Sequence, residues 1–125
     1  MKLDLETRQI GEAAVLYCRG RFTYRDEATA FSQAIAGLLH APQIVVELSG
    51  LEAIDSAGLG ELVVVHMWAK ASGSSLILAG ASPQVRQLFE LTNLSSVFEV
   101  VPTLEDALQS LRPPAAKAKV AVNAA

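Results

Sequence analysis

The sequence is poor in charge, in aromatic residues and in cysteine. Of its 125 residues, 18% are charged and 6% are aromatic, and the one cysteine is Cys18. The Lys and Arg residues are scattered singly and the formal net charge is −3, so no stretch has the concentrated positive charge that binds a phosphate backbone. A lone cysteine in an apolar run predicts a reducing compartment and a thiol that packs as a small hydrophobe. We therefore do not expect nucleic acid as a partner.

Long apolar runs are also missing. The longest, Leu62 to Ala69, contains a histidine and is far shorter than the roughly 20 residues that span a bilayer. Residues 1–9 alternate charged and apolar side chains, unlike the apolar centre of a secretory signal. We expect a cytoplasmic protein with no membrane insertion.

The motifs of enzymes and metal sites are incomplete. His40 and His66 have no cysteine or carboxylate at metal-ligand spacing. Residues 54–58 (IDSAG) resemble a serine-hydrolase nucleophile elbow, but isoleucine stands where that turn requires glycine. Residues 58–60 (GLG) begin like a dinucleotide-binding motif, but the third glycine position is Val63. The sequence therefore favours a protein that is not an enzyme and has no metal site.

The length and the apolar content favour one α/β domain, since 125 residues of which 51% are hydrophobic are enough for one packed core. Alternating or β-branched runs predict a first strand at the sheet edge, a Gly11-Glu12 hairpin turn, and further strands. The predicted strands are residues 2–9, 13–19, 43–48, 75–79 and 97–101. We expect a mixed sheet of four to five strands, parallel after its N-terminal hairpin and packed with about four helices. The domain is predicted to span residues 1–112, followed by a disordered tail at 113–125.

Capping residues and apolar stripes define the helices. Thr23 with Asp26, and Thr103 with Asp106, are typical of capping boxes, and Ser82 is followed by proline at the first helical position. Pro42 is expected to end the first helix, and the second is predicted at residues 57–72. The residues expected to face the core are Ala28, Phe31, Ile35, Leu38, Leu39, Val85, Leu88, Phe89, Thr92, Leu104, Ala107, Leu108 and Leu111.

Asp55 and Ser56 stand between two apolar runs, at the start of the helix that contains Gly58 and Gly60 in its first residues. In one interpretation Asp55 or Ser56 is only the N-cap, worth about 1 kcal/mol. In the other, Ser56 is phosphorylated, because free amides and a positive dipole end at a helix N-terminus tolerate a dianion. A phosphate beside Asp55 would then repel an acidic or apolar partner face.

The run VVELSGLEAIDSAGLGELV, Val45 to Val63, resembles the signature of STAS domains, the family of bacterial anti-sigma factor antagonists. The similarity covers roughly residues 3–111, including GRF at 20–22 and LFELTNLSSVFEV at 88–100, and its specific part is DSAGLG. The resemblance implies that Ser56 is the phosphoacceptor. It also implies that the unphosphorylated protein binds a serine-kinase anti-sigma factor and so releases the sigma factor for transcription. The same kinase then releases the antagonist by phosphorylating it, and a phosphatase resets it. Because the kinase partner binds the ATP, the resemblance implies no cofactor in this chain.

The partner surface expected from this resemblance is the motif loop with the outer side of the following helix. Its residues are Thr23, Asp55, Ser56, Gly58, Leu59, Gly60 and Glu61, with His66 or Trp68 further along. Trp68 is either packed or part of the contact. Three positions depart from the family pattern: Thr23 replaces an acidic residue, Glu47 replaces an aspartate, and Asn93 replaces a glycine. Asparagine, like glycine, tolerates a left-handed backbone conformation.

STAS domains also serve as accessory subunits of ABC-type lipid transporters and as parts of anion permeases. A permease part is disfavoured because the sequence has no membrane span. A transporter accessory is an open alternative, in which Ser56 lies in a constitutive interface and no kinase takes part. An enzyme is the third interpretation.

Overall fold

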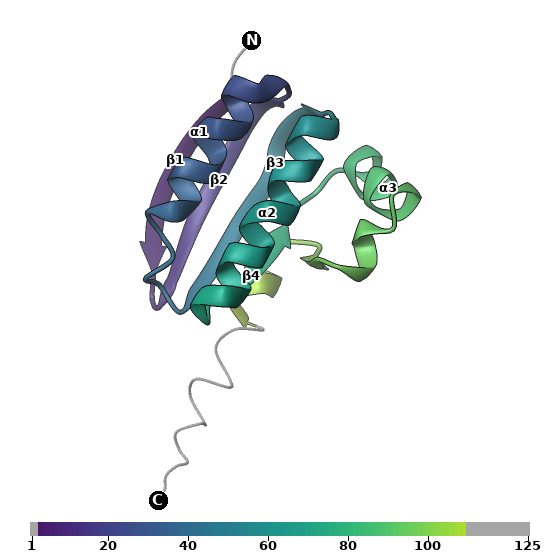
Figure 1. The fold of residues 1–125 in the computed structure, drawn as a ribbon. Coiled ribbons are helices and arrows are strands. Elements are labelled where there is room, and N and C mark those ends of the chain that lie inside the picture. Colours follow the sequence, from purple (N-terminus) through teal and green to yellow (C-terminus); the bar gives the residue numbers. More distant parts are fainter. Residues whose placement is uncertain (1–2, 110–125) are drawn as a thin grey trace, which may run out of the picture.

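A five-stranded sheet organises the part of the chain that the computed structural model describes, residues 3–109 apart from the side chains of residues 24 and 25 (Figure 1). Its strands lie side by side in chain order, β1 pairs antiparallel with β2, and the other pairs are parallel. The mixed sheet with its N-terminal hairpin and edge strand confirms the prediction. The strands are β1 (Leu3–Ile10), β2 (Ala13–Phe22), β3 (Gln43–Ile54), β4 (Ser75–Ala79) and β5 (Glu99–Val101).

Helices connect the parallel strands. They are α1 (Tyr24–Ala36), α2 (Ser56–Ser72), α3 (Pro83–Leu91) with the 3₁₀ turn η1 (Leu94–Ser96), and a helical stretch at residues 104–109. In Figure 1, α1 and α2 lie side by side over one face of the sheet, and α3 lies beyond β4.

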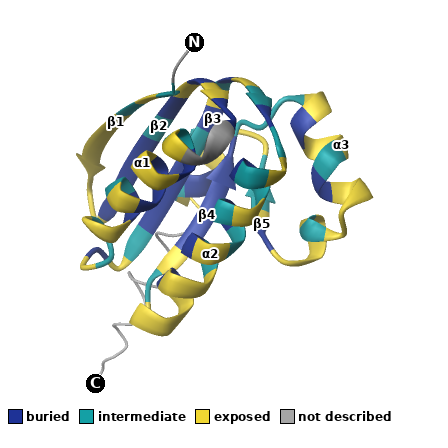
Figure 2. Cartoon of the chain, turned by 45° about the horizontal axis from the view of Figure 1, so that its top comes forward, coloured by how far each residue is buried: buried dark blue, intermediate teal, exposed yellow. Residues whose placement is uncertain are grey.

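The two faces of the sheet have separate cores, because successive strand residues point to opposite sides. On the α1 and α2 face, Leu16 and Val46 pack with Phe31 and Leu62. On the other face, buried strand residues pack with Ala107 of the helical stretch at residues 104–109. Figure 2 shows the buried residues concentrated on the strands and the exposed ones on the outer sides of the helices.

The predicted end of the third strand at residue 48 is wrong, because β3 continues to Ile54, directly before Asp55. The additional strand residues pair with the end of β2, Gly50 with Arg19 and Ile54 with Phe22. The register shifts twice along β2, between residues 17 and 19 and between residues 20 and 21. Periodicity did not reveal this extension because a shifted register breaks the alternation on which the prediction depended. The end of β2 is thereby brought beside the start of α2.

The ends of α1 and β5 also differ from the prediction. The helix α1 ends at Ala36 with Gly37 as its C-cap, ahead of Pro42, although Leu38 and Leu39 still pack against the core as predicted. The last strand begins at Glu99, because the amides of residues 97 and 98 both donate to the Leu94 carbonyl oxygen at 3.0 Å in a turn.

Two predicted caps are confirmed, and the predicted inward position of Thr92 is wrong. The Ser82 hydroxyl accepts a hydrogen bond from the Val85 amide at 3.2 Å, and Thr103 accepts one from the Asp106 amide at 3.1 Å. Thr92, predicted to face the core, is exposed. Its hydroxyl donates to the Leu88 carbonyl oxygen at 2.7 Å instead, because a threonine at a helix end can bond the preceding turn.

Cys18 is buried, and burial, with a smaller contribution from the charge of Glu47, raises the pKa of its thiol to about 12. The thiol therefore packs as the neutral hydrophobe that the sequence predicts. No helix in the described range has the length and apolarity to cross a membrane. The predicted position of Leu111, the domain end at residue 112 and the disordered tail at 113–125 lie outside the described residues.

Candidate functional site

The candidate site is the junction where β3 ends and α2 begins. The Asp55 amide donates to the Phe22 carbonyl oxygen at 3.3 Å, which fixes the start of α2 to the end of β2. Asp55 has the extended backbone of an N-cap, and its Oδ1 accepts a hydrogen bond from the Gly58 amide at 3.0 Å. Asp55 is therefore the residue that caps α2.

Ser56 is the first residue of α2 and is exposed. Because Asp55 supplies the cap, the Ser56 hydroxyl is not needed for it, and within residues 3–109 it forms no hydrogen bond. The first turn of α2 contains no acidic residue. The hydroxyl thus stands in solvent at the positive end of a helix dipole, where added negative charge is tolerated.

Replacing Asp55 by alanine is expected to lower the free energy of unfolding by about 1 kcal/mol, the typical value of an N-cap side chain. Asp55→Ser should retain most of that stability, since serine also accepts from first-turn amides. Urea unfolding followed by circular dichroism measures both variants. Equal stability of Asp55→Ala and the parent chain would contradict the cap assigned to Asp55.

Gly58 is buried beneath this junction. A Cβ atom at this position would lie 2.5 Å from the Phe22 carbonyl oxygen and 2.8 Å from Cγ1 of Ile54. At Gly60 such an atom meets nothing within 4 Å. Of the two glycines that the sequence places in the motif, Gly58 alone is required by the close approach of β2 to α2.

Thr23 occupies the N-cap position of α1, but the predicted capping box with Asp26 is wrong. The backbone is extended as a cap requires, yet the side chain accepts no amide hydrogen bond. The residue is 8% exposed, and its Oγ1, like Oε1 of Glu27, is buried without a hydrogen-bond partner. The side chain is buried without capping the first turn of α1, which leaves a polar atom whose burial costs about 1–3 kcal/mol.

Thr23→Val is therefore expected to raise the free energy of unfolding by about 1 kcal/mol, because it replaces an unpartnered hydroxyl by a methyl group of similar size. The matched control is Thr92→Val, which should lower stability by about 0.5 kcal/mol since it removes the bond from Thr92 to the Leu88 carbonyl oxygen. Thermal unfolding compares the two. A larger loss in Thr23→Val than in the control would show that the Thr23 hydroxyl is satisfied.

The outer side of α2 continues from Ser56 as an apolar surface. Val64, Met67 and Trp68 are 36%, 61% and 37% exposed, and they follow Ser56 and Gly60 at helical spacing. We call these three residues the α2 stripe. Trp68 is thus partly packed, and the exposed part of its side chain is accessible to a partner.

The remaining predicted residues lie around this surface. Leu59 is half-buried and packs against the core, and Glu61 is half-buried. His66 is half-buried with its ring edge-on to Phe98, centroids 5.8 Å apart, so it lies at the boundary between the core and the surface. Among the described residues no group of histidine, cysteine or carboxylate side chains could hold a metal ion.

Sequence reasoning missed Val64 and Met67 as surface residues. The available signal was the apolar character of residues 62–69, interrupted only by His66, which is wider than one buried helix stripe requires. The buried residues of α2, Gly58, Leu62, Val65 and Ala69, account for the inner side only. Apolar residues beyond that side therefore had to face solvent or a partner.

Comparison with known proteins connects this geometry to a family. The sequence model described as "Mlab, STAS domain" matches residues 5–102. A Thermotoga maritima protein named as an anti-sigma factor antagonist is 30% identical over 70 residues, which are 56% of this chain and 62% of that relative, less than two thirds of its length. The crystal structure of an anti-sigma factor antagonist from Mycobacterium paratuberculosis has a TM-score of 0.80 at 26% identity and covers 89% of this chain and 95% of its own.

The fold is also that of SpoIIAA of Bacillus, whose structures are described in an unphosphorylated and a phosphorylated form. Their TM-scores are 0.69 and 0.68 at 18% and 19% identity, covering 88% and 87% of this chain and 99% and 100% of theirs. That protein therefore has structures of both forms that share this overall arrangement of strands and helices.

Proposed function

The chain belongs to the STAS domain family, and on this premise we propose that it is an anti-sigma factor antagonist switched by phosphorylation of Ser56. In its unphosphorylated form it binds a serine-kinase anti-sigma factor, which then releases its sigma factor for transcription. The kinase partner supplies the ATP, and a phosphatase restores the hydroxyl. The protein acts by binding and catalyses no reaction itself.

The observation that carries this proposal is the exposed Ser56 hydroxyl beside a cap that Asp55 supplies. In the transfer, a bond forms between Ser56 Oγ and the γ-phosphorus of the kinase's ATP, and the bond from that phosphorus to the bridging oxygen of ADP breaks. The hydroxyl proton goes to a base of the kinase. No hydrogen bond that holds the fold is lost, because the cap does not depend on Ser56.

The consequence for binding follows from charge. A phosphate adds about −1.5 to −2 charge beside the Asp55 carboxylate, at one end of the α2 stripe. The helix dipole favours this charge, so the domain keeps its fold. A partner face that fits the apolar stripe has to desolvate the dianion, so the complex dissociates.

The proposed interface contains Asp55, Ser56, Gly60, Glu61 and the α2 stripe. Leu59, half-buried against the core, anchors the first turn. Thr23 and Gly58 are buried, so their role is to shape the junction below the surface.

A second candidate is an accessory subunit of an ABC-type lipid transporter. The α2 stripe favours it, because constitutive interfaces are more apolar than transient ones. In that case Ser56 lies inside a permanent contact, and a negative charge there breaks assembly without any kinase.

A pull-down from the native cell's lysate separates the two candidates. Tagged Ser56→Ala and Ser56→Asp proteins are used as baits, and captured proteins are identified by mass spectrometry. The proposal expects Ser56→Ala to capture an ATP-binding serine-kinase anti-sigma factor that Ser56→Asp does not capture. Capture of transporter subunits, or of no kinase that distinguishes the baits, would overturn the sigma-factor assignment.

A further inference from the structure

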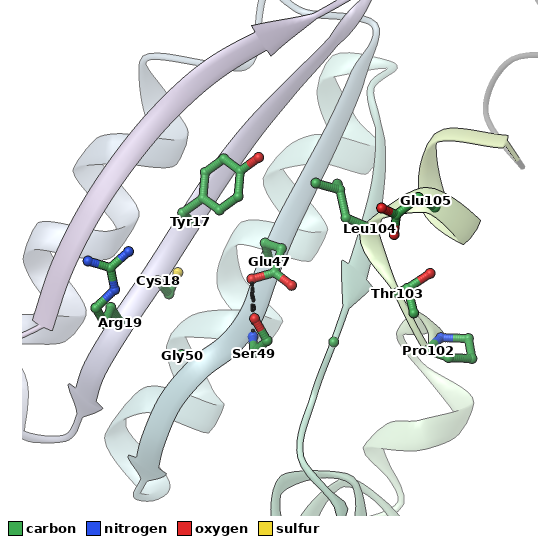
Figure 3. Close-up of a pocket in the computed structure, with 11 residues that line it drawn as sticks. Tyr17, Cys18, Arg19, Glu47, Ser49, Gly50, Pro102, Thr103, Leu104 and Glu105 are labelled. Carbon is green, nitrogen blue, oxygen red and sulfur yellow. Dashed lines mark hydrogen bonds between the residues drawn. The ribbon is translucent and has the colours of Figure 1, made fainter.

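A pocket with a volume of about 470 Å³ lies along the middle of β2 and β3, beside the turn that follows β4 (Figure 3). It opens on the sheet face opposite α1 and α2, where Tyr17 and Leu104 pack against the second core. Small-molecule sites typically have volumes of about 300–1,000 Å³. The pocket contains none of the residues proposed above for the partner interface.

One wall of the pocket is a carboxylate held in a fixed position. Oε1 of Glu47 accepts hydrogen bonds from the Ser49 amide at 3.2 Å and from the Ser49 hydroxyl at 2.9 Å. Figure 3 shows both groups of Ser49 directed at this oxygen. The second oxygen, Oε2, receives no hydrogen bond from the described residues and is a free acceptor.

The Glu47 carboxylate fits beside Gly80 because glycine has no side chain. A Cβ atom at Gly80 would lie 2.6 Å from Oε2 of Glu47, and the backbone has φ +78°, which side chains rarely adopt. The sharp turn after β4 and the position of Glu47 therefore depend on the same glycine. The carboxylate is preorganised by its surroundings, as binding groups usually are.

A guanidinium of opposite charge shares the pocket. Arg19 lines it from β2, and within residues 3–109 it forms no salt bridge with Glu47 or Glu105. Figure 3 shows Arg19 on one side and Glu105 on the other, with Glu47 between them. The pocket therefore has a positive end and a negative end that do not neutralise each other, with the apolar parts of Tyr17 and Leu104 along it.

We propose that this pocket binds a small zwitterion, an amino-acid-like molecule with a primary ammonium group and a carboxylate joined by an aliphatic chain. The ammonium group donates to Oε2 of Glu47, with Glu105 adding negative charge at the same end. The carboxylate accepts two hydrogen bonds from the Arg19 guanidinium, the geometry that this group favours. The aliphatic chain covers Tyr17, which lies on the side of the pocket between Arg19 and Glu47.

The test is an amide NMR titration of the full chain with 6-aminohexanoate. The expected result is saturable shifts at Ser49, Gly50, Gly80 and Thr103, with a dissociation constant of about 1 mM. Hexanoate and hexylammonium, which carry one charge each, should bind about tenfold more weakly, because each loses one charge-assisted contact.

Variants at both ends keep the test independent of any single residue. Glu47→Gln and Arg19→Gln should each weaken binding of 6-aminohexanoate about tenfold. Glu52→Gln and Arg21→Gln, exposed positions on the same two strands and outside the pocket, should leave it unchanged. Absence of saturable shifts up to about 50 mM, or equal binding of the singly charged probes, would overturn the proposal.

Discussion

Gly58→Ala is expected to lower the free energy of unfolding by about 3 kcal/mol, the upper part of the range for overpacking a filled site. The added methyl group would lie 2.5 Å from the Phe22 carbonyl oxygen and 3.1 Å from its ring atom Cγ. A backbone oxygen that is itself bonded to the Asp55 amide cannot move without opening the junction of β2 and α2. Urea unfolding by circular dichroism measures the loss.

Gly60→Ala is the matched control, two residues further along the same helix. Its new methyl group meets nothing within 4 Å, so the higher helix propensity of alanine should stabilise the chain by about 0.5 kcal/mol. The two substitutions should therefore have opposite signs. Equal effects would show that helix propensity, and not the approach to Phe22, governs this turn.

Ser56→Glu is expected to weaken binding to the captured kinase partner at least a hundredfold, about 3 kcal/mol, while the domain keeps its thermal stability. Binding is lost because a buried charge without a counterion is expensive in an apolar contact. Stability is kept because a negative side chain at the first position of α2 interacts favourably with the helix dipole. Calorimetric titration and thermal unfolding of one preparation measure both quantities.

Ser72→Glu provides the comparison at the other end of α2, where Ser72 is also exposed. This variant adds the same charge away from the proposed contact and should bind within about twofold of the parent chain. A similar loss of affinity in both variants would indicate a general charge effect. Loss of stability in Ser56→Glu would mean that the hydroxyl has a structural role.

The fold could be predicted where the local sequence pattern is compatible with only one type of secondary structure. The alternation in residues 3–9 and the β-branched run after Pro42 placed the strands, and Ser82 with Thr103 placed two helix starts. The second half of β3 could not be predicted, since its pairing with β2 includes shifts of register that only the tertiary structure sets. The absence of a cap at Thr23 could not be predicted either, because the burial of its side chain is also set by the tertiary structure.

The candidate site was partly visible in the sequence. A polar pair before a glycine-containing helix indicated both a cap and a modifiable hydroxyl, and the structure assigns the cap to Asp55 and exposes Ser56. The requirement for Gly58 could not be derived, because it depends on Phe22 from a distant strand. The pocket at Glu47 could not be predicted from the sequence either, since Arg19 and Gly80 come from other strands and turns.

The most direct measurement is the affinity of the captured kinase for the chain with and without a phosphate on Ser56. The kinase and ATP are used to phosphorylate the chain, tandem mass spectrometry locates the phosphate, and calorimetry compares the two forms. We predict a single phosphate on Ser56 and a loss of affinity of at least a hundredfold, about 3 kcal/mol. A phosphate at another residue, or equal affinity of the two forms, would contradict it.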